Sequence, residues 1–184
     1  MKHIDKLNKL GACNQAVKWA KEMKNGQSAW DNCERGDWLL WLVGKMSGRP
    51  ESAKRKRLVL CVCECARLVL VHVPKGELRP LKAIEAAEAW AIGEATIEEL
   101  QKARKAAAAY AADAAADAAA YAAAYAAAYA AYAADAAVYA ADAYAADAAA
   151  AYADAADADA RKKTLKQCAD IVRKHYPKVP VVKL

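Results

Sequence analysis

The sequence contains no phenylalanine, and one long segment lacks several further residue types. The 55 residues from Ala106 to Ala160 include no glycine, proline, lysine or arginine. A collagen helix needs glycine at every third position, and a β-sandwich needs frequent turns, so this segment excludes both fold classes. The N-terminal residues also lack an apolar run of signal-peptide length, and we therefore expect a cytoplasmic protein.

Alanine dominates the segment from Ala106 to Ala160, which holds 38 alanines, eight tyrosines, eight aspartates and one valine. Alanine has the highest helix propensity of all residues. We therefore predict an all-α fold, a multi-helix bundle or array. The 184 residues suffice for one domain with its own core. The predicted domain, 1–184, comprises a Trp- and Leu-rich half (1–93), an alanine-rich half (94–176) and an extended tail (177–184).

Positive charge is concentrated outside the alanine-rich segment. The whole chain has 28 Lys and Arg and 22 Asp and Glu, a formal net charge of +6. Eight of the acidic residues are the aspartates of that segment, which leaves 28 basic and 14 acidic residues, or +14, elsewhere. The chain therefore offers a partner a basic surface and a separate acidic one.

Local signals predict where the helices begin and end. Ser28 and Asp37 have side chains typical of N-caps. Thr96, with Glu99 three residues later, is expected to form a capping box, and Gly93 to end the helix before it. The predicted helices are 4–23, 28–36, 38–46, 54–73, 80–93, one that starts at 96, and 161–176, with turns in the alanine-rich segment near 113–117 and 133–137.

Three alternate cysteines, Cys61, Cys63 and Cys65, lie in an apolar run. The β-branched residues of this run are compatible with a strand, but its length and the helical spacing of its charges favour a largely buried helix. Residues two apart on a helix point to different sides, so these thiols cannot readily pair with one another or converge with His72 on a metal ion. We expect reduced, buried cysteines, with no metal and no cofactor.

The sequence offers little support for catalysis. No histidine lies near a cysteine in a recognised catalytic signature, and Glu64 is expected to pair with Arg67 rather than to activate a thiol. We therefore do not expect an enzyme, and no residue is singled out as catalytic.

Five strings along the chain are similar to those of a known family. They are LGACNQA (10–16), AWDNCERGDWLLWL (29–42), RLVLCVCECARLVL (57–70), AIEAAEAWAIG (83–93) and QCADIVRKHYP (167–177). Together they resemble the alanine-rich "putative immunity protein" family of bacteriophages and bacterial toxin-immunity loci, over nearly the whole chain. The resemblance implies an all-helical fold, a phage or bacterial cytoplasmic setting and a function performed by binding.

Candidate partner-binding residues come first from a basic run, Arg49, Lys54, Arg55, Lys56 and Arg57. Such a run is most often the solvated start of a helix. Its charge, however, opposes the positive end of the helix dipole, and this mild cost favours a binding role. An acidic protein or nucleic-acid phosphates would suit it, but no recognition-helix signature follows, so sequence-specific DNA reading is not expected.

A second set of candidates is a stripe of tyrosines and aspartates separated by three or four residues. Its central tyrosines are Tyr121, Tyr125, Tyr129 and Tyr132. These rings are either core residues that pack against the first half of the chain or a ridge that binds a partner.

These observations favour a non-enzymatic binding protein, an immunity or anti-defence factor that occludes a macromolecular target. The expected partner is a protein, either a toxin or a host defence component. The alternative is a nucleic-acid or nucleotide-binding protein that uses the basic residues. No membrane contact is expected. The sequence is compatible with a homo-oligomer as well as with a monomer.

Overall fold

The structure, a computed structural model, describes residues 2–49, 52–113 and 158–181. These residues form helices joined by short loops, without a strand among them, and the predicted all-α fold is confirmed. The predicted turns of the alanine-rich segment lie outside the described residues. The helices are α1 (Lys2–Leu10), α2 (Asn14–Lys21), α3 (Gly26–Asn32), α4 (Gly36–Met46), α5 (Ala53–Arg67), the 3-10 turn η1 (Leu70–His72), α6 (Arg79–Ile92), α7 (Ile97–Asp113) and α10 (Ala158–His175).

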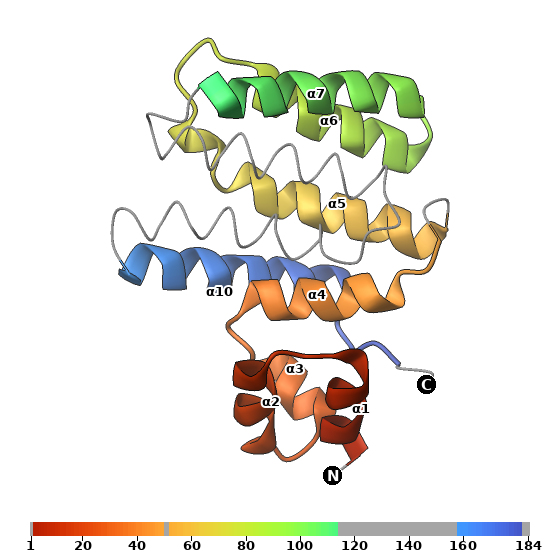
Figure 1. Ribbon diagram of the computed structural model, residues 1–184, viewed down its shortest axis with the longest axis vertical. Coiled ribbons are helices and arrows are strands. Elements are labelled where there is room, and N and C mark those ends of the chain that lie inside the picture. Colours follow the sequence, from red (N-terminus) through yellow and green to blue (C-terminus); the bar gives the residue numbers. More distant parts are fainter. Residues whose placement is uncertain (1, 50–51, 114–157, 182–184) are drawn as a thin grey trace.

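The helices are stacked in layers (Figure 1). Helices α1 to α3 form the end of the molecule that holds the N-terminus, and α4 and α10 lie side by side in the next layer. Helix α5 contacts α4 and α10 on one side and α6 on the other, and α7 packs on α6. Helix α5 is therefore the centre of the described structure. No helix in the described part of the chain is long and apolar enough to span a bilayer.

Several predicted helix ends are confirmed. Gly93 ends α6 in the left-handed conformation, with φ 88°. The backbone N–H of Thr96 donates to Glu99 Oε2 at 2.8 Å, and the N–H of Glu99 donates to Thr96 Oγ1 at 3.2 Å. These reciprocal bonds are the expected capping box at the start of α7.

Other predictions of helix ends are wrong. The helix expected over 28–36 ends at Asn32, and the one expected over 54–73 ends at Arg67, before a separate 3-10 turn. The single helix over 4–23 is divided into α1 and α2, because Gly11 adopts a φ of 77° that a helix does not allow. Asn25, not Ser28, caps α3, since its side chain accepts a hydrogen bond from the Ser28 N–H. Asp37 lies inside the first turn of α4, where Arg35 binds its carboxylate, rather than at the N-cap.

The core surrounds α5. Cys61, Cys63 and Cys65 are all fully buried among apolar side chains, which confirms the buried helix predicted for the cysteine run. The six cysteines form no disulfide. Cys13, which directly precedes α2 in the loop after Gly11, is exposed.

Helices α4 and α10 approach each other closely at Gly36. A Cβ atom at this position would lie 2.4 Å from the Cβ of Cys168 in α10 and 2.8 Å from the backbone oxygen of Leu165. Only glycine, which has no Cβ, fits such a gap without movement of the backbone. The layer that joins the N-terminal helices to α5 therefore depends on the absence of a side chain at this position.

Candidate partner-binding surface

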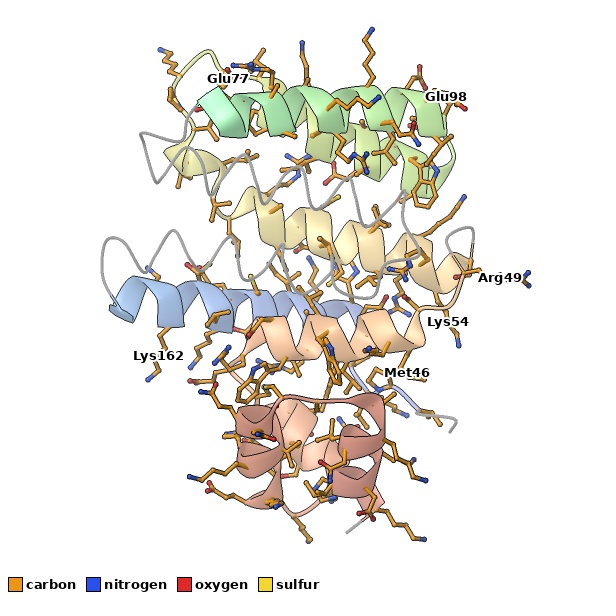
Figure 2. All side chains as sticks on the ribbon, viewed as in Figure 1. Met46, Arg49, Lys54, Glu77, Glu98 and Lys162 are labelled. Atoms are coloured by element: carbon orange, nitrogen blue, oxygen red, sulfur yellow. The ribbon has the colours of Figure 1, made fainter. Side chains whose placement is uncertain are left out.

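The predicted basic residues lie around the start of α5. Ser52 caps the helix and accepts a hydrogen bond from the Arg55 N–H at 3.2 Å. The first turn that follows contains no acidic residue. Arg49 precedes the cap, and its side chain and that of Lys54 lie on the same side of the molecule, next to the start of α5 (Figure 2). The positive end of the α5 dipole therefore adds to the charge of these side chains.

Arg55 does not belong to this surface. Its side chain is fully buried, so the predicted role in partner binding is wrong for this residue. The reason is the helical phase: Arg55 lies three, four and seven residues before Leu58, Val59 and Val62, all of which are fully buried. One of the four consecutive basic residues thus points into the core while its neighbours point outward or along the surface.

Aromatic rings hold two of the remaining cations. The Lys56 amine lies 5.5 Å from the ring centre of Trp90 in α6. The Arg57 guanidinium lies 4.8 Å from the ring centre of Tyr176 and donates a hydrogen bond to the backbone oxygen of His175. Such cation–π contacts orient a cation without neutralising its charge.

The end of α10 contributes residues that the sequence did not single out. Lys174 donates a hydrogen bond to Glu64 Oε1 at 2.7 Å, and His175 Nε2 lies 2.9 Å from Glu64 Oε2. The expected Glu64–Arg67 pair is not formed, because Arg67 binds Glu88 in α6 instead. The bonds from Lys174 and His175 hold the pKa of Glu64 below its usual value of 4.5. Only the string around residues 167–177 pointed to this region.

Hydrogen bonds also connect the end of α10 to α3 and to Cys33, the residue that follows it. The Arg173 guanidinium donates to the backbone oxygen of Cys33 at 2.7 Å and to Asp170 at 2.6 Å. The indole N–H of Trp30 donates to the backbone oxygen of Tyr176 at 2.9 Å. The ring of Tyr176, and with it the Arg57 guanidinium, is therefore held in a fixed position.

We define the basic end as Arg49, Lys54 and Arg57. All three side chains are exposed, and none forms an ion pair with a carboxylate of the described residues. The positive charge is thus available to an anionic group of a partner. Lys56 lies beside this surface and is partly covered.

The central tyrosines of the predicted stripe, Tyr121, Tyr125, Tyr129 and Tyr132, lie outside the described residues. The preceding tyrosine of that stripe, Tyr110, is buried in α7 at 7% exposure, with the guanidinium of Arg79 4.8 Å from its ring centre. At this one position the stripe is part of the core.

Comparison with known proteins identifies the family of the chain. No curated protein and no solved structure gives a match. A family model described as "Imm-5 like putative immunity protein" matches residues 48–174, which include the start of α5 and most of α10. The first two strings of the resemblance, 10–16 and 29–42, lie outside this match. Because the match covers more than half of the residues, the chain belongs to the Imm-5 like putative immunity protein family.

Proposed function

We propose that the protein is a non-enzymatic immunity protein that binds another protein in the cytoplasm of a bacterial cell, in a phage or bacterial defence setting, and blocks its action by covering it. The observation that carries this proposal beyond the family is the basic end. Arg49, Lys54 and Arg57 carry exposed positive charges with no acidic partner among the described residues. An acidic surface of a toxin or of a host defence protein would be complementary to them.

The geometry suits rapid and specific binding. Unpaired surface charge of one sign accelerates the encounter with a partner of opposite sign and disfavours partners of like sign. Arg57 is already held by the ring of Tyr176 and the backbone oxygen of His175. A side chain that is fixed before binding loses less conformational entropy in the complex.

The buried thiols argue for binding rather than covalent chemistry. Burial raises the pKa of Cys33 to about 11, and burial also raises the pKa of Cys63. A thiol with a raised pKa is protonated at neutral pH, whereas the thiolate is the nucleophilic form. We therefore assign the buried cysteines a packing role.

Nucleic acid is the second candidate partner. The cations of the basic end and the excess of positive charge outside the alanine-rich segment would also suit phosphates. The two candidates differ in their response to salt. Binding to a duplex should weaken linearly with the logarithm of salt concentration, by about 0.9 logarithmic units for each phosphate contact, while a protein interface with an apolar centre should respond less steeply.

The test is a capture experiment with charge-reversed variants. The bait proteins are the wild type, the variant Arg49→Glu/Lys54→Glu, and a control with the same change of charge on α7, Lys102→Glu/Lys105→Glu. Lys102 and Lys105 are exposed and lie in α7, at the end of the stack opposite the N-terminal helices. Lysates from infected or toxin-challenged cells are applied with and without nuclease.

The proposal predicts a protein that the wild type and the α7 control retain after nuclease treatment and that the basic-end variant loses. That protein, expressed alone, should harm the host, and co-expression of the wild-type chain should restore growth. Retention of nucleic acid alone would favour the second candidate. Equal retention of the partner by all three baits would show that the basic end is not the contact surface.

A further inference from the structure

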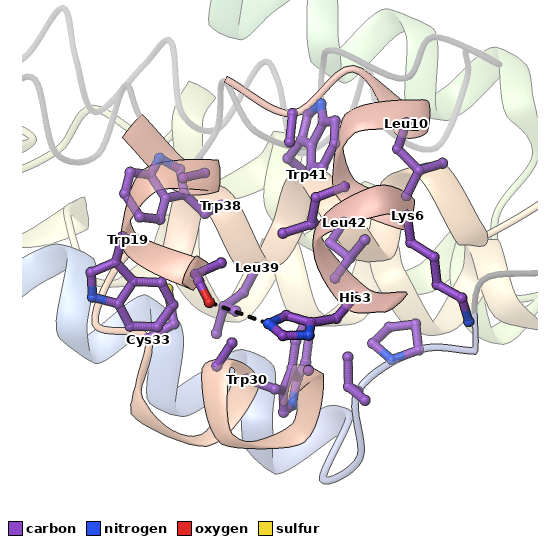
Figure 3. A pocket seen from close by; sticks show the side chains of 18 of the residues that line it. His3, Lys6, Leu10, Trp19, Trp30, Cys33, Trp38, Leu39, Trp41 and Leu42 are labelled. Atoms are coloured by element: carbon purple, nitrogen blue, oxygen red, sulfur yellow. Dashed lines mark hydrogen bonds between the residues drawn. The ribbon is translucent and has the colours of Figure 1, made fainter. Parts of the chain in front are cut away.

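A large cavity lies between the N-terminal helices and α4, away from the basic end. It has a volume of about 900 Å³ and is lined by residues of α1, α2, α3 and α4 together with the C-terminal segment at Val179–Val181. Figure 3 shows the side chains of α1 facing those of α4 across this space. Every lining residue lies outside residues 48–174, so the cavity is separate from the part of the chain that the family model matches.

The walls of the cavity are mostly apolar and aromatic. Four of the five tryptophans of the chain line it, namely Trp19, Trp30, Trp38 and Trp41. The rings of Trp19 and Trp38 lie 6.1 Å apart at an angle of 58°. Leu10 and Leu42 contribute aliphatic surface from the opposite helices. A concave site of this volume with aromatic walls is typical of pockets for small ligands.

The polar groups inside the cavity largely satisfy one another. His3 Nε2 lies 3.2 Å from the backbone oxygen of Ala20, and the Trp30 indole N–H donates to the backbone oxygen of Tyr176. Asp37 accepts hydrogen bonds from Arg35 at 2.8 and 2.5 Å, which balances the negative charge. Water in the interior would therefore have few groups to bind, and an apolar molecule could displace it at little cost.

The charge of the lining is positive. Lys2 and Lys6 come from α1, and Lys24 comes from the turn before α3. Within the described ranges, none of these three amines forms an ion pair or a hydrogen bond with another side chain. The lining thus combines apolar walls with cationic groups that lack a counter-charge.

We propose that this cavity binds a small amphipathic anion, a molecule with an aliphatic or aromatic tail and one anionic head group such as a carboxylate. The tail lies against the tryptophans that line the cavity, and the lysine amines attract the head group. This proposal is independent of the proposed function, because the cavity shares no residue with the basic end.

The test compares three probes with the same 12-carbon tail, the two ionic ones below their micelle-forming concentrations and the alcohol below its solubility limit. Laurate is anionic, 1-dodecanol is neutral and dodecyltrimethylammonium is cationic. Fluorescence of the cavity tryptophans and isothermal titration calorimetry report binding to the full chain. We expect saturable binding of laurate at one site. Its affinity should be about tenfold higher than that of dodecanol, as one favourable charged contact would give. The difference from the affinity of the cationic probe should be larger still.

Two variants locate the site. Lys6→Gln/Lys24→Gln should bring the laurate affinity close to that of dodecanol while leaving dodecanol binding unchanged. The matched control Lys102→Gln/Lys105→Gln on α7 should bind both probes as the wild type does. Ala16→Trp, which adds a ring to the cavity wall, should abolish the binding of both probes while the circular dichroism spectrum stays helical.

The proposal is overturned by either of two results. One is the absence of saturable laurate binding to the wild type. The other is that the Lys6→Gln/Lys24→Gln variant binds laurate as tightly as the α7 control does. The head group would then lie away from these lysines. Neither measurement uses Ala16→Trp, so both would still decide the proposal if that variant failed to fold.

Discussion

The guanidinium of Arg57 in α5 lies 4.8 Å from the ring centre of Tyr176, the residue that follows α10. These two residues are far apart in the sequence, and their contact joins the N-terminal part of the central helix to the residue that follows the last one. The Tyr176 hydroxyl also donates to the backbone oxygen of Lys54 at 3.5 Å. The position of the basic end thus depends on a ring that is supplied by the C-terminal segment.

A double-mutant cycle should measure this contact. We expect Arg57→Met and Tyr176→Leu each to lower the free energy of unfolding, with a coupling energy of about 0.5–1 kcal/mol between them, because cation–π contacts at exposed sites have this magnitude. Urea unfolding of the two single variants and the double variant supplies the values. The pair Lys105→Met and Tyr176→Leu serves as the control, because Lys105 lies in α7, which packs on α6, whereas Tyr176 follows α10. Its two effects should be additive to within about 0.3 kcal/mol.

The Glu64 carboxylate should make stability depend on pH in the acidic range. Its hydrogen bonds to Lys174 and His175 hold its pKa in the folded state below 4.5. A group with a lowered pKa contributes stability above its unfolded pKa and loses that contribution as the pH falls through its folded pKa. Glu64→Gln should therefore be less stable than the wild type near pH 6 and should approach it as the pH falls from about 5 toward 3.

Urea unfolding at a series of pH values compares the two proteins. Glu98→Gln, a change at an exposed residue of α7, controls for the loss of one negative charge. If the free energy of unfolding of Glu64→Gln differed from that of the wild type by the same amount at every pH, the ion pairs of Glu64 would not be the cause of the difference.

Signals that act within a few residues predicted much of the fold. The capping box of Thr96 and Glu99 and the terminal Gly93 are local devices, and both are present. Gly11 was missed because a glycine inside a helical pattern is compatible both with a continuous helix and with a break. The choice between them depends on how α1 and α2 pack, which is not a local property.

The candidate surface was less accessible to sequence reasoning. The burial of Arg55 could be inferred from its helical spacing to Leu58 and Val62, but the run of four basic residues suggested a uniformly exposed segment. The partners of Glu64 come from α10, 110 and 111 residues further along the chain. Such contacts, and the cavity that four helices and the C-terminal segment form, arise from tertiary packing and have no local pattern.

Substitution of Gly36 should show how closely α4 and α10 are packed. Gly36→Ala would place a Cβ 2.4 Å from that of Cys168, and we expect a loss of about 1–3 kcal/mol in the free energy of unfolding, as is usual for overpacked cores. Gly26→Ala is the matched control, since Gly26 is also the first residue of a helix and its added Cβ would meet only the His3 Cβ at 3.4 Å. That control should change the stability by less than about 0.5 kcal/mol. Equal effects of the two substitutions would contradict the close approach.

Thiol labelling should separate Cys13 from the other five cysteines. Cys13 is exposed, whereas Cys33, Cys61, Cys63, Cys65 and Cys168 are buried. Burial raises the pKa of Cys33 to about 11, so this thiol is both shielded and protonated at neutral pH. We expect a disulfide reagent such as DTNB to label one thiol of the native protein rapidly and the remainder only on unfolding. The variant Cys13→Ser should abolish the rapid phase, and a rapid phase that persists in this variant would mean that a buried thiol is accessible through local opening of the core.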